Sequence, residues 1–197
     1  MELSGMDHVE QVRRFALGGC RLVQVRDKKL SSKELFKVVS SAVAIAHGFG
    51  MKVIVNDRVD IAMAAGAAGV HLGQGDLPPE HARLLLGSEA MIGYSTHSIE
   101  QAIEAAKLPV DYIAIGPIFA THTKQDPDPV VGLDGLRGVR AAIGQFPLVA
   151  IGGINERNLR AVLTAGADSV ALVSELYKDS ANMTAQFTKL SNLADNV

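Results

Sequence analysis

Residues 52–73, with the sequence KVIVNDRVDIAMAAGAAGVHLG, decide the fold class of this chain. Two short apolar runs rich in β-branched residues, at 52–57 and 69–73, flank a helical stretch that closes with glycine. The same alternation recurs along the chain, and it is typical of βα units around a parallel sheet. The other predicted strands are residues 21–26, 91–95, 112–117, 147–153 and 169–174.

Helices are predicted between these strands, and several begin at a recognisable capping residue. The caps and their helices are Ser31 or Ser32 before residues 35–47, Asp76-Leu77-Pro78 before 81–86, and Ser98 before 99–107. A further helix, at residues 7–17, has no strand before it.

The predicted elements, seven strands and about eight helices, indicate an α/β fold, a (β/α)8 TIM barrel that lacks its first strand. An open, doubly wound sheet is the alternative on pattern alone. Polar residues gather at the C-terminal ends of nearly every predicted strand, which favours the barrel because barrel active sites lie on that rim. Residues 1–6, MELSGM, are too short and too polar to supply a strand. We therefore expect the chain to be N-terminally incomplete, with the strands at 21–26 and 169–174 flanking a gap.

The composition restricts the classes of function open to the chain. Its 197 residues, 48% of them hydrophobic, suit one domain, residues 1–197, with an apolar core. A formal net charge of −2 gives no field that would attract nucleic acid or an anionic membrane. The single cysteine, Cys20, has no internal disulfide partner, so we interpret it as a core residue in a reducing compartment. No apolar run reaches about 18 residues and no charged leader precedes an apolar stretch, so we expect a cytoplasmic protein.

Two cations and an amide lie at the end of the first predicted strand, as Gln24, Arg26 and Lys28. Because side chains alternate along a strand, Gln24 and Arg26 point the same way, into the mouth of a barrel. Lys28 follows at the same spacing if the strand extends that far. A solvated strand end is the alternative interpretation of Arg26 and Lys28.

Two carboxylates, Asp57 and Asp76, close successive βα units. Two carboxylates supplemented by waters and substrate phosphates are a normal way to hold Mg²⁺, so the pair predicts a shared metal. Alternatively, Asp76 caps the helix that follows it and Asp57 satisfies a turn.

Small residues end the last two predicted strands, as Gly152-Gly153 and Val173-Ser174. Barrels often bind phosphate at this place through backbone N–H groups, and glycines allow close approach. Paired glycines also occur in ordinary tight turns.

A long loop at residues 121–129, THTKQDPDP, offers hydroxyls and a lysine that suit phosphate, although its Pro and Asp content equally suits an exposed loop without function. His71, His97 and His122 lack the spacing of a zinc site, and no Ser, Cys or Thr nucleophile stands in a recognised motif. Covalent catalysis is therefore disfavoured.

Taken together, these segments make the chain resemble the thiamine phosphate synthase family over about residues 18–177. Seven motifs occur in order and without large gaps. They are Q-x-R-x-K from Gln24, N-D-R-x-D-x-A from Asn56, G-V-H-L-G-Q-x-D from Gly69, G-x-S-T-H-S from Gly93, G-P-I-F-x-T-x-T-K from Gly116, A-I-G-G-I from Ala150, and V-S from Val173. Each motif is weak alone, but the ordered set is specific.

The resemblance implies an enzyme that joins 4-amino-2-methyl-5-hydroxymethylpyrimidine diphosphate to 4-methyl-5-(2-phosphooxyethyl)thiazole, giving thiamine phosphate and diphosphate by Mg²⁺-assisted dissociative substitution. By similarity, Asp57 and Asp76 would bind Mg²⁺. The residues implied for the pyrimidine diphosphate are Gln24, Arg26, Lys28, Asn56, Ser95 and Lys124, and those implied as catalytic are Arg26, Lys28, Ser95 and Lys124. The residues implied for the thiazole phosphate are Thr121, His122, Thr123, Gly153 with the adjacent Gly152, Val173 and Ser174. The chain departs from the family at His122, where many relatives have proline, and this concerns loop stiffness more than chemistry.

Two other functions stay open on the sequence. A thiazole tautomerase of the related family would share the barrel and the thiazole phosphate site, but the complete diphosphate and metal set argues against it. A non-catalytic barrel would bind phosphate ligands without turnover. The expected partners are small-molecule substrates, without nucleic acid or membrane, and a homo-oligomer is compatible with the sequence.

Overall fold

The computed structural model describes residues 6–121 and 128–196 of the chain. In these ranges the chain forms seven strands: β1 (Leu22–Val25), β2 (Lys52–Asn56), β3 (Gly69–Leu72), β4 (Met91–Thr96), β5 (Tyr112–Ile115), β6 (Leu148–Ile151) and β7 (Ser169–Ala171). The α-helices of the same ranges are α1 (His8–Leu17), α2 (Ser32–His47), α3 (Val59–Ala65), α4 (Pro79–Leu86), α5 (Ile99–Ala105), α6 (Gly132–Ile143), α7 (Leu159–Thr164) and α8 (Met183–Asp195). Two short 3₁₀ helices, η1 (Ser174–Tyr177) and η2 (Ser180–Asn182), connect β7 to α8. All seven predicted strands are therefore present.

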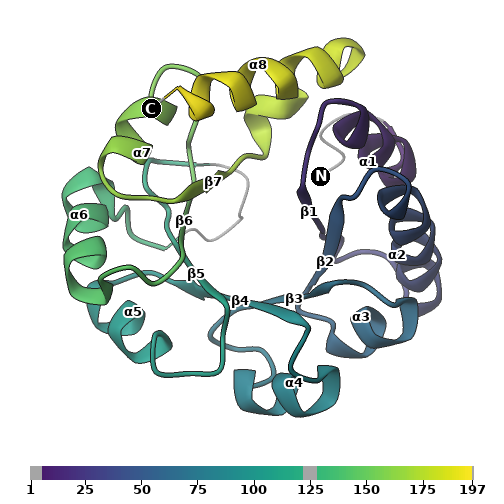
Figure 1. The fold of residues 1–197 in the computed structure, drawn as a ribbon, viewed down its shortest axis with the longest axis horizontal. Helices are drawn as coiled ribbons and strands as arrows, with labels where there is room; N and C mark the ends of the chain where they lie inside the picture. Colours follow the sequence, from purple (N-terminus) through teal and green to yellow (C-terminus); the bar gives the residue numbers. More distant parts are fainter. Residues whose placement is uncertain (1–5, 122–127, 197) are drawn as a thin grey trace.

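The strands pair in parallel in the order in which they occur in the sequence, from β1 to β7. Because this order never reverses, the doubly wound alternative, whose sheet has a switch point, is excluded. Figure 1 shows the strands as an inner curved row with the helices outside it. Among the described residues, β1 pairs only with β2 and β7 only with β6, so the sheet is open between its two end strands. The described fold is thus a TIM-barrel-like sheet lacking one strand, with the predicted gap.

The helical layer is continuous where the sheet is open, because α8 extends across to α1 (Figure 1). The rings of Phe15 and Phe187 lie with centroids 6.0 Å apart. The Arg14 guanidinium donates to the Ser180 carbonyl at 2.8 Å, and the Thr184 hydroxyl donates to the Arg14 carbonyl at 3.1 Å. Apolar burial and these hydrogen bonds hold the two ends of the chain together.

Local capping explains where several helices begin. Ser31 forms a capping box with Glu34 at the start of α2, and Ser98 accepts the Gln101 N–H at the start of α5. The helix after Asp76 begins differently, because Pro78 is the residue before α4 and no side chain caps it. Asp76 is therefore not a helix cap.

Alternation along the strands separates a core outside the sheet from the barrel interior. On β2, Val53 and Val55 belong to the hydrophobic core shared with the helices. Ile54 is buried and Asn56 half-buried on the opposite side, which faces the interior. The interior side therefore carries the polar residues toward the C-terminal rim.

Two arginine–aspartate ion pairs with the same arrangement connect helices to strands at the end of the barrel away from the polar rim. Arg83 of α4 pairs with Asp111 at 2.7 Å, and Asp111 accepts the Ile92 N–H at 2.6 Å. Arg140 of α6 pairs with Asp168 at 2.5 Å, and Asp168 accepts the first N–H of β6 at 2.7 Å. Both aspartates precede a strand, so these ion pairs stabilise the fold at the face away from the polar rim. None of the described helices is long and apolar enough to span a bilayer.

Candidate active site

The first group of predicted residues follows β1. The strand ends at Val25, so it does not extend as far as Lys28, and the condition for Lys28 to continue the strand alternation is not met. The chain bends instead and brings the Lys28 ammonium 3.4 Å from the Asp57 carboxylate. Gln24 and Arg26 are exposed, and their side chains have no hydrogen-bond partner among the described residues. Their donors are thus available to a ligand at the rim.

Asp57 stands directly after β2 in an unusual backbone conformation. Its φ is 62°, in the left-handed region that residues other than glycine seldom adopt. Its N–H donates to the His71 carbonyl at 2.9 Å, which helps to hold this conformation and ties the residue to β3. Strained backbone of this kind persists where the surroundings fix it and often marks a functional position.

Asp76 lies close to Asp57 at the same rim. Its Oδ2 accepts the Gly73 N–H at 2.7 Å, so the carboxyl closes the turn after β3. Burial, and then the neighbouring Asp57 carboxyl, raise the pKa of Asp76 above its usual value, while Lys28 opposes this shift. Two carboxylates that repel each other beside a single lysine have the charge that a divalent cation would neutralise. Within the described ranges no group of three or more His, Cys, Asp or Glu side chains could hold a metal, so such a cation would need further ligands from water or substrate.

A cavity of about 250 Å³ lies beside this group. Its lining residues are Asp27, Lys28, Leu30, Leu35, Asn56, Asp57 and Arg58. Asp27 accepts the Lys29 N–H at 2.7 Å and pairs with His8 at 2.9 Å, so it shapes the loop that carries Lys28. The cavity joins three predicted residues, Lys28, Asn56 and Asp57.

Ser95, near the end of β4, belongs to a buried hydrogen-bonded chain that the sequence did not predict. His71 Nε2 lies 2.8 Å from Ser95 Oγ, and His71 Nδ1 lies 2.8 Å from the Tyr112 hydroxyl. Burial lowers the pKa of His71 to about 4 and raises that of the Tyr112 phenol. The imidazole is therefore neutral near pH 7. The one available signal was Gly93 inside a strand, since such glycines often mark close approach of other groups.

The predicted glycine turn follows β6. Gly152 and Gly153 have φ values of 100° and 64°, which favour glycine. A Cβ on Gly152 would lie 2.5 Å from Pro117 Cβ, and one on Gly153 would lie 2.7 Å from the Ala120 carbonyl oxygen. The turn is thus pressed against the segment after β5. Ser174 begins η1 shortly after the neighbouring strand β7, so the two predicted phosphate segments leave adjacent strands.

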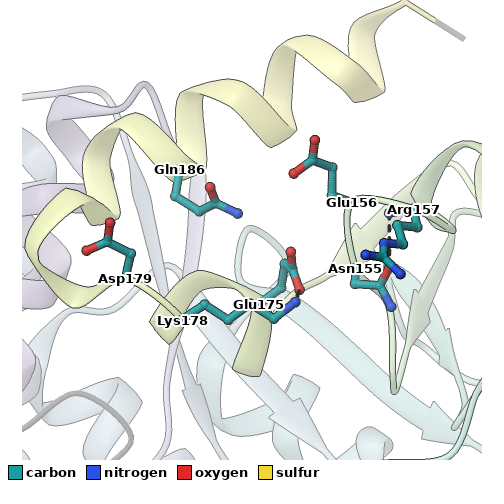
Figure 2. A pocket seen from close by; sticks show the side chains of 7 residues that line it. All are labelled: Asn155, Glu156, Arg157, Glu175, Lys178, Asp179 and Gln186. Carbon is teal, nitrogen blue, oxygen red and sulfur yellow. Dashed lines mark hydrogen bonds and ion pairs between the residues drawn. The ribbon is translucent and has the colours of Figure 1, made fainter.

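A cavity of about 810 Å³ opens beside the glycine turn and was not predicted. It is lined by Asn155, Glu156, Arg157, Glu175, Lys178, Asp179 and Gln186 (Figure 2). Inside it the buried Glu175 carboxylate pairs with Lys178 at 2.5 Å. Asn155 donates to the Gly153 carbonyl at 3.3 Å and so links the cavity to the turn. No predicted site residue lines it, whereas the smaller cavity near Asp57 is lined by Lys28, Asn56 and Asp57.

Most of the predicted loop residues cannot be placed. Thr121 is half-buried, while His122, Thr123 and Lys124 lie outside the described residues. His97 contacts both sides of this segment, because its Nδ1 lies 2.6 Å from the Gly116 carbonyl oxygen and its Nε2 lies 3.5 Å from Asp128. His97 thus contacts the described residues on both sides of the loop, Gly116 and Asp128.

The chain is similar to known proteins over most of its length. A family model described as thiamine monophosphate synthase matches residues 2–176. The thiamine-phosphate synthase of Koribacter versatilis is 48% identical over 180 residues, which cover 90% of this chain and 83% of that protein. The enzyme of the same name from Persephonella marina is 43% identical over 194 residues, covering 98% and 91%.

A solved structure shows the same fold. Thiamine phosphate pyrophosphorylase from Pyrococcus furiosus superimposes with a TM-score of 0.87 at 33% identity, over 96% of this chain and 90% of that one. The model match spans most of the chain, and these relatives align over most of their own length. The chain therefore belongs to the thiamine monophosphate synthase family.

Proposed function

We propose that this chain condenses the pyrimidine diphosphate with the thiazole phosphate to give thiamine phosphate and diphosphate. The observation that carries the proposal is the grouping of Lys28, Asp57 and Asp76 at the rim. Asn56 lines one cavity together with Lys28 and Asp57. A lysine that faces two carboxylates suits a substrate diphosphate and a divalent cation bound together.

The cations at the rim would act on the leaving group. As the C–O bond of the pyrimidine diphosphate breaks, negative charge grows on the diphosphate, and fixed positive donors stabilise it. Arg26 and Lys28 are the donors after β1, and Lys124 would add a third from the loop. Gln24, Asn56 and Ser95 would hold the same substrate through amide and hydroxyl groups.

The two aspartates would hold Mg²⁺. Asp57 and Asp76 fit the ion because their mutual repulsion, which contributes to the raised pKa of Asp76, would be relieved by a cation between them. When bound, the ion would supply further positive charge to the leaving diphosphate.

The thiazole phosphate would bind at the opposite part of the rim. The Gly152-Gly153 turn and the Val173-Ser174 segment offer backbone N–H groups at adjacent strand ends, and Thr121, His122 and Thr123 would close the site from the loop. Held by its phosphate, the thiazole presents its ring nitrogen to the pyrimidine methylene carbon, whose electron-rich aminopyrimidine supports the developing cation. Rate enhancement then comes from positioning and electrostatics, without a general base.

The same proposal covers the compartment and the oligomeric state of the chain. The chain would act in the cytoplasm as one domain on small-molecule substrates, as a monomer or a homo-oligomer. Burial raises the pKa of the Cys20 thiol, and a buried unreactive thiol suits a reducing compartment.

Released diphosphate distinguishes the candidate functions. With both substrates and Mg²⁺ present, the proposed enzyme releases diphosphate, and omission of the thiazole phosphate stops formation of thiamine phosphate. A tautomerase converts its thiazole substrate without releasing diphosphate, and a binding protein takes up the thiazole phosphate without turnover. Either of these two outcomes would reject the proposal.

A further inference from the structure

Three side chains form a continuous path inside the barrel, from a buried phenol to the rim. Tyr112 contacts His71, and His71 contacts Ser95, each across 2.8 Å. The exposed fractions of His71 and Tyr112 are 8% and 9%, whereas Ser95 is half-buried at the rim. The Ser95 hydroxyl is therefore the part of this path that a ligand can reach, and the rings of His71 and Tyr112 are buried beneath it.

The strand register explains how the path forms. His71 on β3 and Tyr112 on β5 both stand opposite Gly93 on the strand between them. A Cβ on Gly93 would lie 2.1 Å from Tyr112 Cζ and 2.5 Å from His71 Nδ1. The missing side chain at Gly93 is therefore what allows the two rings to meet over β4. Ser95 lies two residues further along the same strand, on the same face.

The directions of the two hydrogen bonds follow from the requirement that the Tyr112 hydroxyl donate its hydrogen to an acceptor. The Tyr112 hydroxyl is buried, and burial keeps it protonated, so its hydrogen requires an acceptor. Among the described residues the partner of this hydroxyl is His71 Nδ1. If Tyr112 donates to Nδ1, a neutral imidazole carries its hydrogen on Nε2. His71 then donates to Ser95 Oγ, and the Ser95 hydroxyl hydrogen is left for another acceptor.

We propose that Tyr112 and His71 are positioning residues that make Ser95 a hydrogen-bond donor toward the departing diphosphate. This inference rests on the proposed function, because it assigns Ser95 to the leaving group. The opposite arrangement, with Ser95 donating to Nε2, would turn the oxygen lone pairs of Ser95 toward an anion and would leave the Tyr112 hydrogen unpaired. Tyr112 and His71 thus favour the arrangement in which the Ser95 hydroxyl donates to the diphosphate as negative charge develops on it.

The hydrogen position on His71 can be measured without any turnover. Nitrogen-15 NMR of the histidine-labelled protein at neutral pH distinguishes protonated from unprotonated ring nitrogens, and the signal of His71 is assigned by its loss in His71→Gln. We expect hydrogen on Nε2 and none on Nδ1. Hydrogen on Nδ1 alone would overturn the proposal, whatever the activity of the protein.

Kinetics test whether the pair acts through Ser95. Tyr112→Phe should lower kcat by roughly 10- to 100-fold with little change in KM, because the contact strengthens as charge develops. His71→Gln keeps an N–H donor and should retain more activity than His71→Leu. In a Ser95→Ala background, Tyr112→Phe should cost nothing further.

A half-buried tyrosine, Tyr177, provides the matched control. The Tyr177 hydroxyl donates to Gln11 of α1 at 2.7 Å, and its ring contacts Phe15 of the same helix, so Tyr177→Phe should leave kcat and KM unchanged. Equal losses from Tyr112→Phe with and without Ser95 would show a purely structural role and overturn the inference. If the wild-type protein released no diphosphate, the proposed function would fail, and the NMR result would still report on the pair.

Discussion

Replacing Gly93 with alanine tests how tightly the barrel interior is packed around the site. The new methyl carbon would lie 2.1 Å from Tyr112 Cζ and 2.3 Å from its hydroxyl oxygen. Both contacted rings, of Tyr112 and His71, are buried, so neither can swing into solvent. Overpacking of a core costs about 1–3 kcal/mol, and an unpaired buried polar group costs about 1–3 kcal/mol more. We expect the free energy of unfolding to fall by about 2–6 kcal/mol.

Urea denaturation measures this loss, read from the midpoint at an unchanged m-value. Gly75→Ala is the matched control, because a Cβ there meets no atom within 4 Å and its φ is not in the left-handed region. It should change stability by no more than about 0.5 kcal/mol. A Gly93→Ala protein as stable as this control would refute the packing argument and the close contact of the two rings.

Three further predictions concern the charged residues. Diphosphate release should be abolished by a metal chelator, by Asp57→Asn or by Asp76→Asn, while the circular dichroism spectrum stays native. Because asparagine tolerates the positive φ of Asp57, Asp57→Asn removes the negative charge without straining the backbone. Because burial and Asp57 raise the pKa of Asp76, its stabilising contribution is present at low pH and is lost as pH rises through the raised pKa. The metal-free Asp76→Asn protein should therefore gain in Tm relative to the wild type as pH increases from about 4 to 7, and a constant difference would contradict this sign. Lys124→Ala should cost on the order of 3 kcal/mol of transition-state stabilisation, seen in kcat; a change confined to the KM for thiazole phosphate would show that the lysine serves the other substrate.

Much of the fold could be predicted because parallel strands of a barrel have a simple pattern. The runs at β2 and β3 are apolar and β-branched, and the polar residues after them lie at one rim in the structure, as predicted. Some predicted strands extended one residue too far at their C-terminal ends, for example to Arg26 and Asp57, because apolar periodicity does not show where the backbone turns. The left-handed φ of Asp57 depends on its contact with the His71 carbonyl, which is a tertiary interaction.

The site was predictable where neighbouring strand ends supply the residues. Asp57 and Asp76 lie together because β2 and β3 are adjacent, and Lys28 reaches them through a loop. The contact of Tyr112 with His71 spans two strand pairings and depends on a missing side chain at Gly93, so spacing along the chain does not reveal it. The cavity around Glu175 and Gln186 joins the segment after β6 with η1 and α8, so it also depends on tertiary packing.

The central claim is that this chain, whose described strands form an open seven-stranded sheet, carries a working thiamine phosphate synthase site. The most direct measurement is mass-spectrometric quantification of thiamine phosphate and diphosphate formed from the two substrates with Mg²⁺. We predict equal molar amounts of both products from the wild-type chain, and neither from Asp76→Asn. Diphosphate formed without thiamine phosphate, or both products formed equally well by Asp76→Asn, would contradict the account.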